Sequence, residues 1–102
     1  MEKNRTEEQR RFYEAILSLE TEEECSAFFE DIFTIREMQD LAQRWQVAQM
    51  LDAGKNYQEI SAATGASTAT ISRVNKCLMY GSGGYRTVLD KTRKGDESRV
   101  EL

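Results

Sequence analysis

Proline and histidine are both absent from this chain of 102 residues, which contains only six glycines and two cysteines. The lack of proline and the low glycine content favour helices, because these two residues have the poorest helix propensities. The lack of histidine excludes a histidine general base and histidine metal ligands. Cys25 and Cys77 cannot build a disulfide framework, so we expect a protein of the reducing cytoplasm.

Long apolar runs are also missing, since none approaches the 18 or so residues that a membrane helix needs. No glycine-rich phosphate loop, paired-cysteine motif or nucleophile elbow occurs. The segment GSGG at 81–84 follows a predicted helix, so it indicates a helix end and a hinge. We therefore expect no catalytic residue, no metal site, no cofactor and no membrane contact: the chain does not have the features of an enzyme.

Charge is unevenly distributed along the chain, whose formal net charge is −4. Residues 1–40 carry 5 Lys and Arg against 12 Asp and Glu, whereas residues 41–102 carry 9 against 6. Residues 55–95 are the most basic window, with 7 against 2. One interpretation of this uneven distribution is that the charges simply lie on two solvent-exposed helical faces. The other is that the acidic and basic parts of the chain have different partners.

Apolar residues at helical spacing predict an all-α chain that forms one domain over residues 1–102. Six helices are expected, over residues 6–19, from residue 21, and over 34–53, 57–64, 68–79 and 85–92. Residues 93–102 show no periodicity and are expected to be a frayed tail.

The third predicted helix has an unusually broad apolar surface. Its apolar stripe consists of Met38, Leu41, Ala42, Trp45 and Ala48. Three further apolar residues widen this stripe, namely Val47, Met50 and Leu51. Packing on a single neighbour requires a stripe of about 100°. In so small a chain, the excess predicts a homodimer in which a second copy covers part of this helix.

Residues 57–79 have the spacing of a helix-turn-helix with Gly65 at the turn. Ile60 and Ala63 before the turn, with Ile71 and Val74 after it, are expected to pack the two helices together. Glycine suits the turn because it adopts positive φ without steric cost. The alternative is an ordinary helical hairpin whose Ser and Thr residues serve only as caps.

The second helix of this motif begins with small and polar residues, which allow a close approach to DNA. Hydroxyl groups and arginine can bond base edges or phosphates, and an alanine methyl can meet a thymine methyl. The candidates for base or near-base contacts are Thr68, Ala69, Thr70, Ser72 and Arg73, and those for phosphate contacts are Tyr57, Gln58 and Lys76.

The stretch from residue 33 to 78 reads FTIREMQDLAQRWQVAQMLDAGKNYQEISAATGASTATISRVNKCL. It resembles the tryptophan repressor family (the TrpR-like superfamily), and within it the YerC/YecD-type branch. The segment TGASTATISR at 64–73 is its most specific part. The resemblance implies a six-helix fold, an intertwined homodimer and two recognition helices in successive major grooves, about 34 Å apart. It therefore implies a sequence-specific DNA-binding transcriptional regulator, and more narrowly a repressor.

In that family a tryptophan ligand lies between two arginines, and Arg44 and Arg73 match them. Thr34 matches a threonine at the pocket edge. However, Val74 stands where the family has glycine, and Cys77 stands where it has a ligand-binding serine. Valine takes up the space of an indole, and a thiol is a weaker hydrogen-bond partner than a hydroxyl. We therefore expect that tryptophan is not the effector.

Two other interpretations of this pocket stay open: Arg44 pairs with Asp40 and no ligand binds, or a different small molecule binds. A rival function also stays open, namely a helical protein-interaction module without nucleic-acid binding. The acidic N-terminal part favours that rival, and a salt-dependent shift of duplex DNA separates the two functions.

Overall fold

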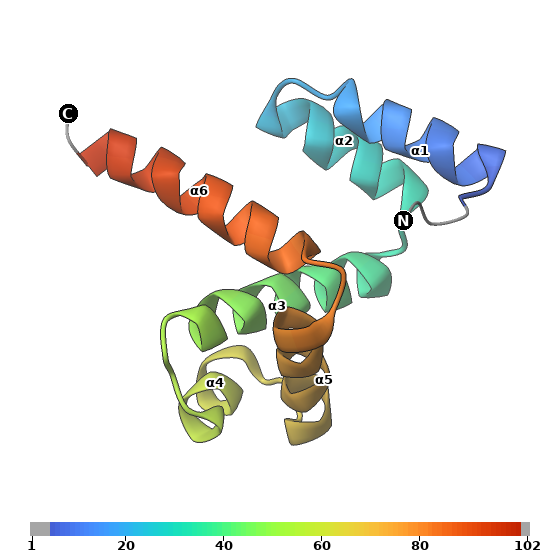
Figure 1. Ribbon diagram of the computed structural model, residues 1–102. Helices are drawn as coiled ribbons and strands as arrows, with labels where there is room; N and C mark the ends of the chain where they lie inside the picture. Colours follow the sequence, from blue (N-terminus) through green and yellow to red (C-terminus); the bar gives the residue numbers. More distant parts are fainter. Residues whose placement is uncertain (1–4, 101–102) are drawn as a thin grey trace. The chain divides into compact units, whose positions relative to one another are not determined.

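The computed structural model describes the backbone of residues 5–100 and the side chains of residues 5–93. That part of the chain consists of helices and contains no strand (Figure 1). The helices are α1 (Glu7–Leu17), α2 (Glu22–Ile32), α3 (Ile35–Asp52), α4 (Tyr57–Thr64), α5 (Thr68–Tyr80) and α6 (Gly84–Val100). The prediction of an all-α chain with six helices is confirmed. No helix in the described range is long and apolar enough to span a membrane.

Side chains at the helix starts explain why the elements begin where they do. Asn56 caps α4 by accepting a hydrogen bond from the Glu59 backbone N–H at 2.9 Å, and the Glu59 carboxylate accepts one from the Asn56 N–H at 3.0 Å. Thr34 and Glu37 form the same reciprocal pair at the start of α3. Each such cap stabilises a helix by about 1 kcal/mol.

Helix α6 is longer than its sequence predicts. We predicted a helix over residues 85–92, whereas α6 comprises Gly84–Val100. The predicted end at Thr92 is therefore wrong. Ion pairs one turn apart, Arg86 with Asp90 and Asp90 with Arg93, support the helix where apolar periodicity ends. The backbone of residues 93–100, which we predicted to be a frayed tail, continues this helix, and residues 101–102 lie outside the described residues.

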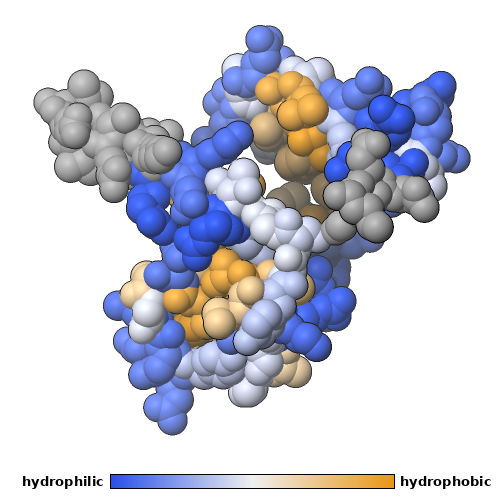
Figure 2. All heavy atoms as spheres, in the orientation of Figure 1, coloured by the Kyte–Doolittle hydropathy of each residue, from blue (hydrophilic) through white to orange (hydrophobic). Residues whose placement is uncertain are grey.

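The internal contacts of the chain divide into two compact units, residues 1–38 and 39–102. In the first unit, ring contacts run along the α1–α2 hairpin and on to Phe33, with centroids 5.5–6.3 Å apart for successive members of the series Phe12, Phe28, Phe29 and Phe33. Yet α1 and α2 contain no buried residue, and Leu17 is 83% exposed. Figure 2 shows apolar atoms on the surface of this hairpin. The unit by itself therefore lacks an enclosed core.

The second unit contains the hydrophobic core. Figure 1 shows α4 and α5 against α3, and their buried side chains meet there, namely Val47, Ala48, Ile60, Ala66, Ile71 and Val74. Ile60, Ile71 and Val74 face inward as predicted, but Ala63 is exposed. Ala66 takes its place, because the left-handed Gly65 ends α4 and turns the chain so that Ala66 folds back against the core.

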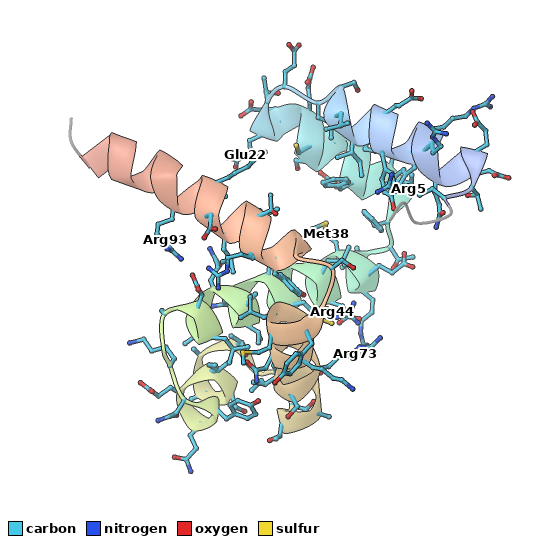
Figure 3. All side chains as sticks on the ribbon, viewed as in Figure 1. Arg5, Glu22, Met38, Arg44, Arg73 and Arg93 are labelled. Atoms are coloured by element: carbon cyan, nitrogen blue, oxygen red, sulfur yellow. The ribbon has the colours of Figure 1, made fainter. Side chains whose placement is uncertain are left out.

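Ion pairs join α6 to the end of α3. Asp52 accepts a hydrogen bond from Arg86 at 2.8 Å and another from Arg93, whose side chain is labelled in Figure 3. The Arg86 hydrogen bond, with a smaller contribution from Arg93, lowers the pKa of Asp52 against the opposing effect of burial. The Asp52 side chain is only 16% exposed, so the pairing between α3 and α6 is partly shielded from solvent.

Candidate nucleic-acid interface

A network of hydrogen bonds fixes the turn between α4 and α5. Gly65 adopts the left-handed conformation with φ of 75°. The Ser61 hydroxyl donates to the Ala66 carbonyl at 3.0 Å, and the Ala66 N–H donates to the Thr64 hydroxyl at 3.1 Å. Gln43 of α3 donates its side-chain amide to the Thr64 carbonyl at 3.1 Å. The turn that leads into α5 is therefore held by α3 as well as by α4.

Ser67 is the N-cap of α5, a role that our sequence analysis did not assign. Its hydroxyl accepts from the Thr70 backbone N–H and donates to the Thr70 hydroxyl, both at 3.1 Å. The signal was available, since a serine directly before a helical pattern is a typical cap. Thr70 is only partly exposed, so it is less accessible than the other candidates for base contacts.

The outer face of α5 carries the remaining candidates for base contacts and one for phosphate contact. Each of them is exposed, and they are Thr68, Ala69, Ser72, Arg73 and Lys76. No acidic residue occurs in α5, so nothing in this helix offsets its two cations or the partial positive charge of its N-terminus. A polyanion can approach this face without meeting a like charge from α5.

The two candidates on α4 differ in their surroundings. Gln58 is exposed in the first turn of the helix. Tyr57 is partly buried and packs against the core, so its ring also has a structural role. Both stand at the N-terminus of α4, where backbone N–H groups favour a phosphate.

A groove of about 230 Å³ lies beside the outer face of α5. Side chains from α3, α5 and α6 line it, namely Arg44, Thr70, Arg73, Val74, Cys77 and Tyr85. Figure 3 shows Arg44 and Arg73 on the same side of this unit. Four of the five residues predicted for a ligand pocket are thus brought together. Thr34, the fifth, belongs to the other unit, where it caps α3.

Val74 and Tyr85 restrict this groove. Val74 is only 2% exposed and belongs to the hydrophobic core as well as to the groove wall. Tyr85, absent from the predicted pocket, stacks on Trp45 with ring centroids 6.4 Å apart and planes 13° apart. Burial raises the pKa of Tyr85, the nearby Cys77 raises it further, and Arg44 opposes both. Sequence periodicity could assign Tyr85 to a helix face, but it could not place that face at the groove.

A second, more apolar groove of about 530 Å³ adjoins the first. Its lining comprises Trp45, Cys77, Gly81, Ser82, Gly84, Tyr85 and Val88. Cys77 and Tyr85 line both grooves, so these two side chains form the wall that the grooves share.

An all-helical chain in which a fixed turn presents the small, polar and basic face of a second helix is typical of helix-turn-helix DNA-binding regulators. The sequence pattern of the Trp repressor protein family matches residues 7–93, and the chain belongs to that family. This membership places it among regulators that bind DNA, and not in a family of enzymes.

Individual relatives agree with this assignment. The chain is 49% identical over 94 residues to the uncharacterized protein YerC of Bacillus subtilis (strain 168), covering 92% of this chain and 90% of YerC. It is similar to the crystal structure of a candidate Trp repressor from Staphylococcus aureus, with a TM-score of 0.84, 45% identity and coverage of 87% and 89% of the two chains. It is also similar to the crystal structure of a TrpR-like protein from Eubacterium eligens ATCC 27750, with a TM-score of 0.83 and 47% sequence identity. That match covers 85% of this chain and 90% of the other. The resemblance to the YerC-type branch is confirmed.

Proposed function

We propose that this protein is a transcriptional regulator that binds specific sequences in duplex DNA through α5 and acts as a repressor. The observation that carries this proposal is the outer face of α5, which combines exposed small side chains, two cations and no acidic residue. The hydrogen bonds that fix the preceding turn support it, because a recognition helix must hold one angle relative to the groove.

The side chains on this face divide by chemistry. Arg73 can form two parallel hydrogen bonds to a guanine, and Thr68, Ala69 and Ser72 are small enough to lie against neighbouring base edges. Thr70 contributes mainly through the cap that it shares with Ser67. Lys76 and the N-terminus of α4, with Gln58 and Tyr57, suit phosphates on either side.

DNA binding is proposed to be independent of tryptophan. Val74 belongs to the packed core, so an indole entering the groove beside Arg44 would have to displace core atoms. Overpacking of that kind costs about 1–3 kcal/mol. A smaller effector that fits between Arg44 and Arg73 is the alternative for this groove.

The active species is proposed to be a homodimer in the cytoplasm, where it meets duplex DNA. The exposed apolar side chains of α1, α2 and the start of α3 support the dimer, among them Leu17, Ile32, Ile35 and Met38. A two-fold dimer also presents two copies of α5, which suits a symmetric operator.

Selection of genomic fragments with purified protein, with and without a mixture of amino acids, tests the proposal. We expect recovery of fragments that share one inverted repeat, bound equally well in both conditions. The recovered site should then be shifted in gels more tightly than random DNA, with an affinity that falls steeply as salt rises. Absence of any salt-dependent shift would contradict this function and favour the protein-interaction module.

A further inference from the structure

The stacked pair of Trp45 and Tyr85 stands where three helices of the second unit meet. Trp45 comes from α3 and Tyr85 from the first turn of α6, and both rings pack against the core cluster. Tyr85 also forms, with Cys77 of α5, the wall shared by the two grooves. The ring of Tyr85 therefore lies against the side of α5 that flanks its DNA-facing surface, in the groove that Arg73 also lines.

We propose that Tyr85 is a positioning residue, an aromatic group built into the chain that braces α5 in its DNA-binding orientation in place of a small-molecule effector. This inference rests on the proposed function, because the position that the brace maintains is the one in which α5 reads DNA.

The packing explains how a side chain on α6 can act on α5. A half-buried aromatic ring contributes through the area that it buries, and a stacked pair contributes about 0.5–1.5 kcal/mol more. The brace is anchored at both ends, because Trp45 belongs to the core-packed part of α3 and α6 is tied to α3 through Asp52 and Arg86. Since Tyr85 shares its wall with Cys77, loss of the ring would remove support from the C-terminal half of α5 on this face.

The linker before α6 is built to bring Tyr85 to this place. Gly81 lies so close to α5 that a Cβ there would come within 2.3 Å of the Cys77 carbonyl oxygen. Gly83 adopts φ of 88°, a value that favours glycine. The chain therefore reverses tightly at 81–84 and starts α6 directly beside Cys77.

Removal of the ring and its return as a free molecule test the brace. Tyr85→Ala should lower the affinity for the selected operator about tenfold, with a smaller effect on random DNA. The probe p-cresol, which is the tyrosine side chain as a free phenol, should enter the space left by the ring and restore at least half of the loss, since apolar cavities of this kind bind small aromatic molecules. Tyr85→Phe keeps the ring and should bind like the wild type.

Tyr80→Ala is the matched control, because Tyr80 lies at the end of α5 and is 80% exposed. It should change the operator affinity little and should show no response to p-cresol. If Tyr85→Ala loses its helical circular dichroism, Tyr85→Leu takes its place, since it keeps an apolar contact but not the stacking. The same loss of operator affinity is expected of that variant.

Two readouts do not depend on DNA. Trp45 is the only tryptophan in the chain, so its fluorescence should change on removal of the stacked ring and change again as p-cresol binds. Amide hydrogen exchange in α5 of the free protein should quicken in Tyr85→Ala and slow again with p-cresol. If the wild type binds no DNA, the proposed function fails. Amide hydrogen exchange in α5 of the free protein would still test whether Tyr85 supports this helix. Unchanged exchange and unchanged operator affinity in Tyr85→Ala would overturn it, as would p-cresol binding that restores neither.

Discussion

At Val74 the requirements of the core and of the groove meet in one side chain. The residue is 2% exposed, and it contacts the core cluster while forming part of the groove beside Arg44 and Arg73. A glycine here would open the groove, but it would also remove core packing and make α5 less favourable by a few tenths of a kcal/mol in helix propensity. The valine therefore stabilises α5 and at the same time narrows the groove beside Arg44 and Arg73.

We expect L-tryptophan to show no binding to the wild type by isothermal titration calorimetry, because Val74 takes up the space of the indole. The double variant Val74→Gly, Cys77→Ser should gain weak binding and lose stability, since Arg44 and Arg73 remain in place while core packing is lost. Cys77→Ser alone is the control and should not bind, because it keeps the valine. Micromolar binding to the wild type would refute this expectation.

Arg73 and Lys76 are both exposed cations of α5, one turn apart, and their roles should differ. Arg73→Ala should weaken operator binding by about 1–3 kcal/mol and relax the sequence preference, if its guanidinium reads a base. Lys76→Ala should weaken operator and random DNA alike and reduce the salt slope by about 1, as loss of a phosphate contact does. Gel shifts over a salt series separate the two, and equal binding by both variants and the wild type would be evidence against this interface.

At the scale of elements, the sequence predicted those helix ends that depend on contacts between residues close together in the chain. The range of α4 is found as predicted because Asn56, Glu59 and Gly65 fix both of its ends through contacts within the segment. The extension of α6 past Thr92 was missed because apolar periodicity ends there, whereas the ion pair of Asp90 with Arg93 spans that point. The place of Tyr85 depends on the path of the linker at 81–84, a tertiary feature that periodicity does not encode.

The same distinction applies to the candidate interface. The outward face of α5 followed from spacing alone, since helix geometry places Thr68, Ser72 and Arg73 near one another once Ile71 and Val74 are inside. Exposure of Ala63 and burial of Ala66 did not follow, because the turn at Gly65 decides which alanine faces the core.

The ion pairs of Asp52 should make the junction of α3 and α6 sensitive to acid. The pKa of Asp52 is lowered in the folded protein, so its contribution to the unfolding free energy is complete above the ordinary aspartate pKa of about 4 and is lost as the pH falls through the lowered value. Asp52→Asn should therefore lower stability at neutral pH and flatten the decline of stability below about pH 4.

Urea unfolding over a pH series measures this effect. Glu7→Gln is a suitable control, because Glu7 pairs with Arg11 at a site where both side chains are largely exposed, and such pairs contribute little. A pH profile of Asp52→Asn identical to that of the wild type would show that this pairing does not hold α6.

At the scale of the whole molecule, the two units differ in how far each can stabilise itself. The second unit encloses a core, with Val47, Ile60 and Ile71 fully buried. In the first unit the described residues form a hairpin of α1 and α2 in which three phenylalanine rings, followed by Phe33, touch in series, but no residue is buried in α1 or α2. A segment of fewer than about 40 residues rarely folds without a partner, a metal or disulfides.

The hairpin therefore needs a second surface, and a second copy of the chain is the partner that we expect. Sedimentation at micromolar concentration should give twice 11.7 kDa, and the urea midpoint should rise with protein concentration, since association stabilises the folded state. Phe29→Ala should weaken the dimer and shift the mass toward the monomer, because the ring contacts both Phe28 and Phe33. Glu23→Ala, an exposed change on the same helix, should leave the mass unaltered. A stably folded monomer of 11.7 kDa at these concentrations would mean that the apolar face of the hairpin is satisfied within one chain.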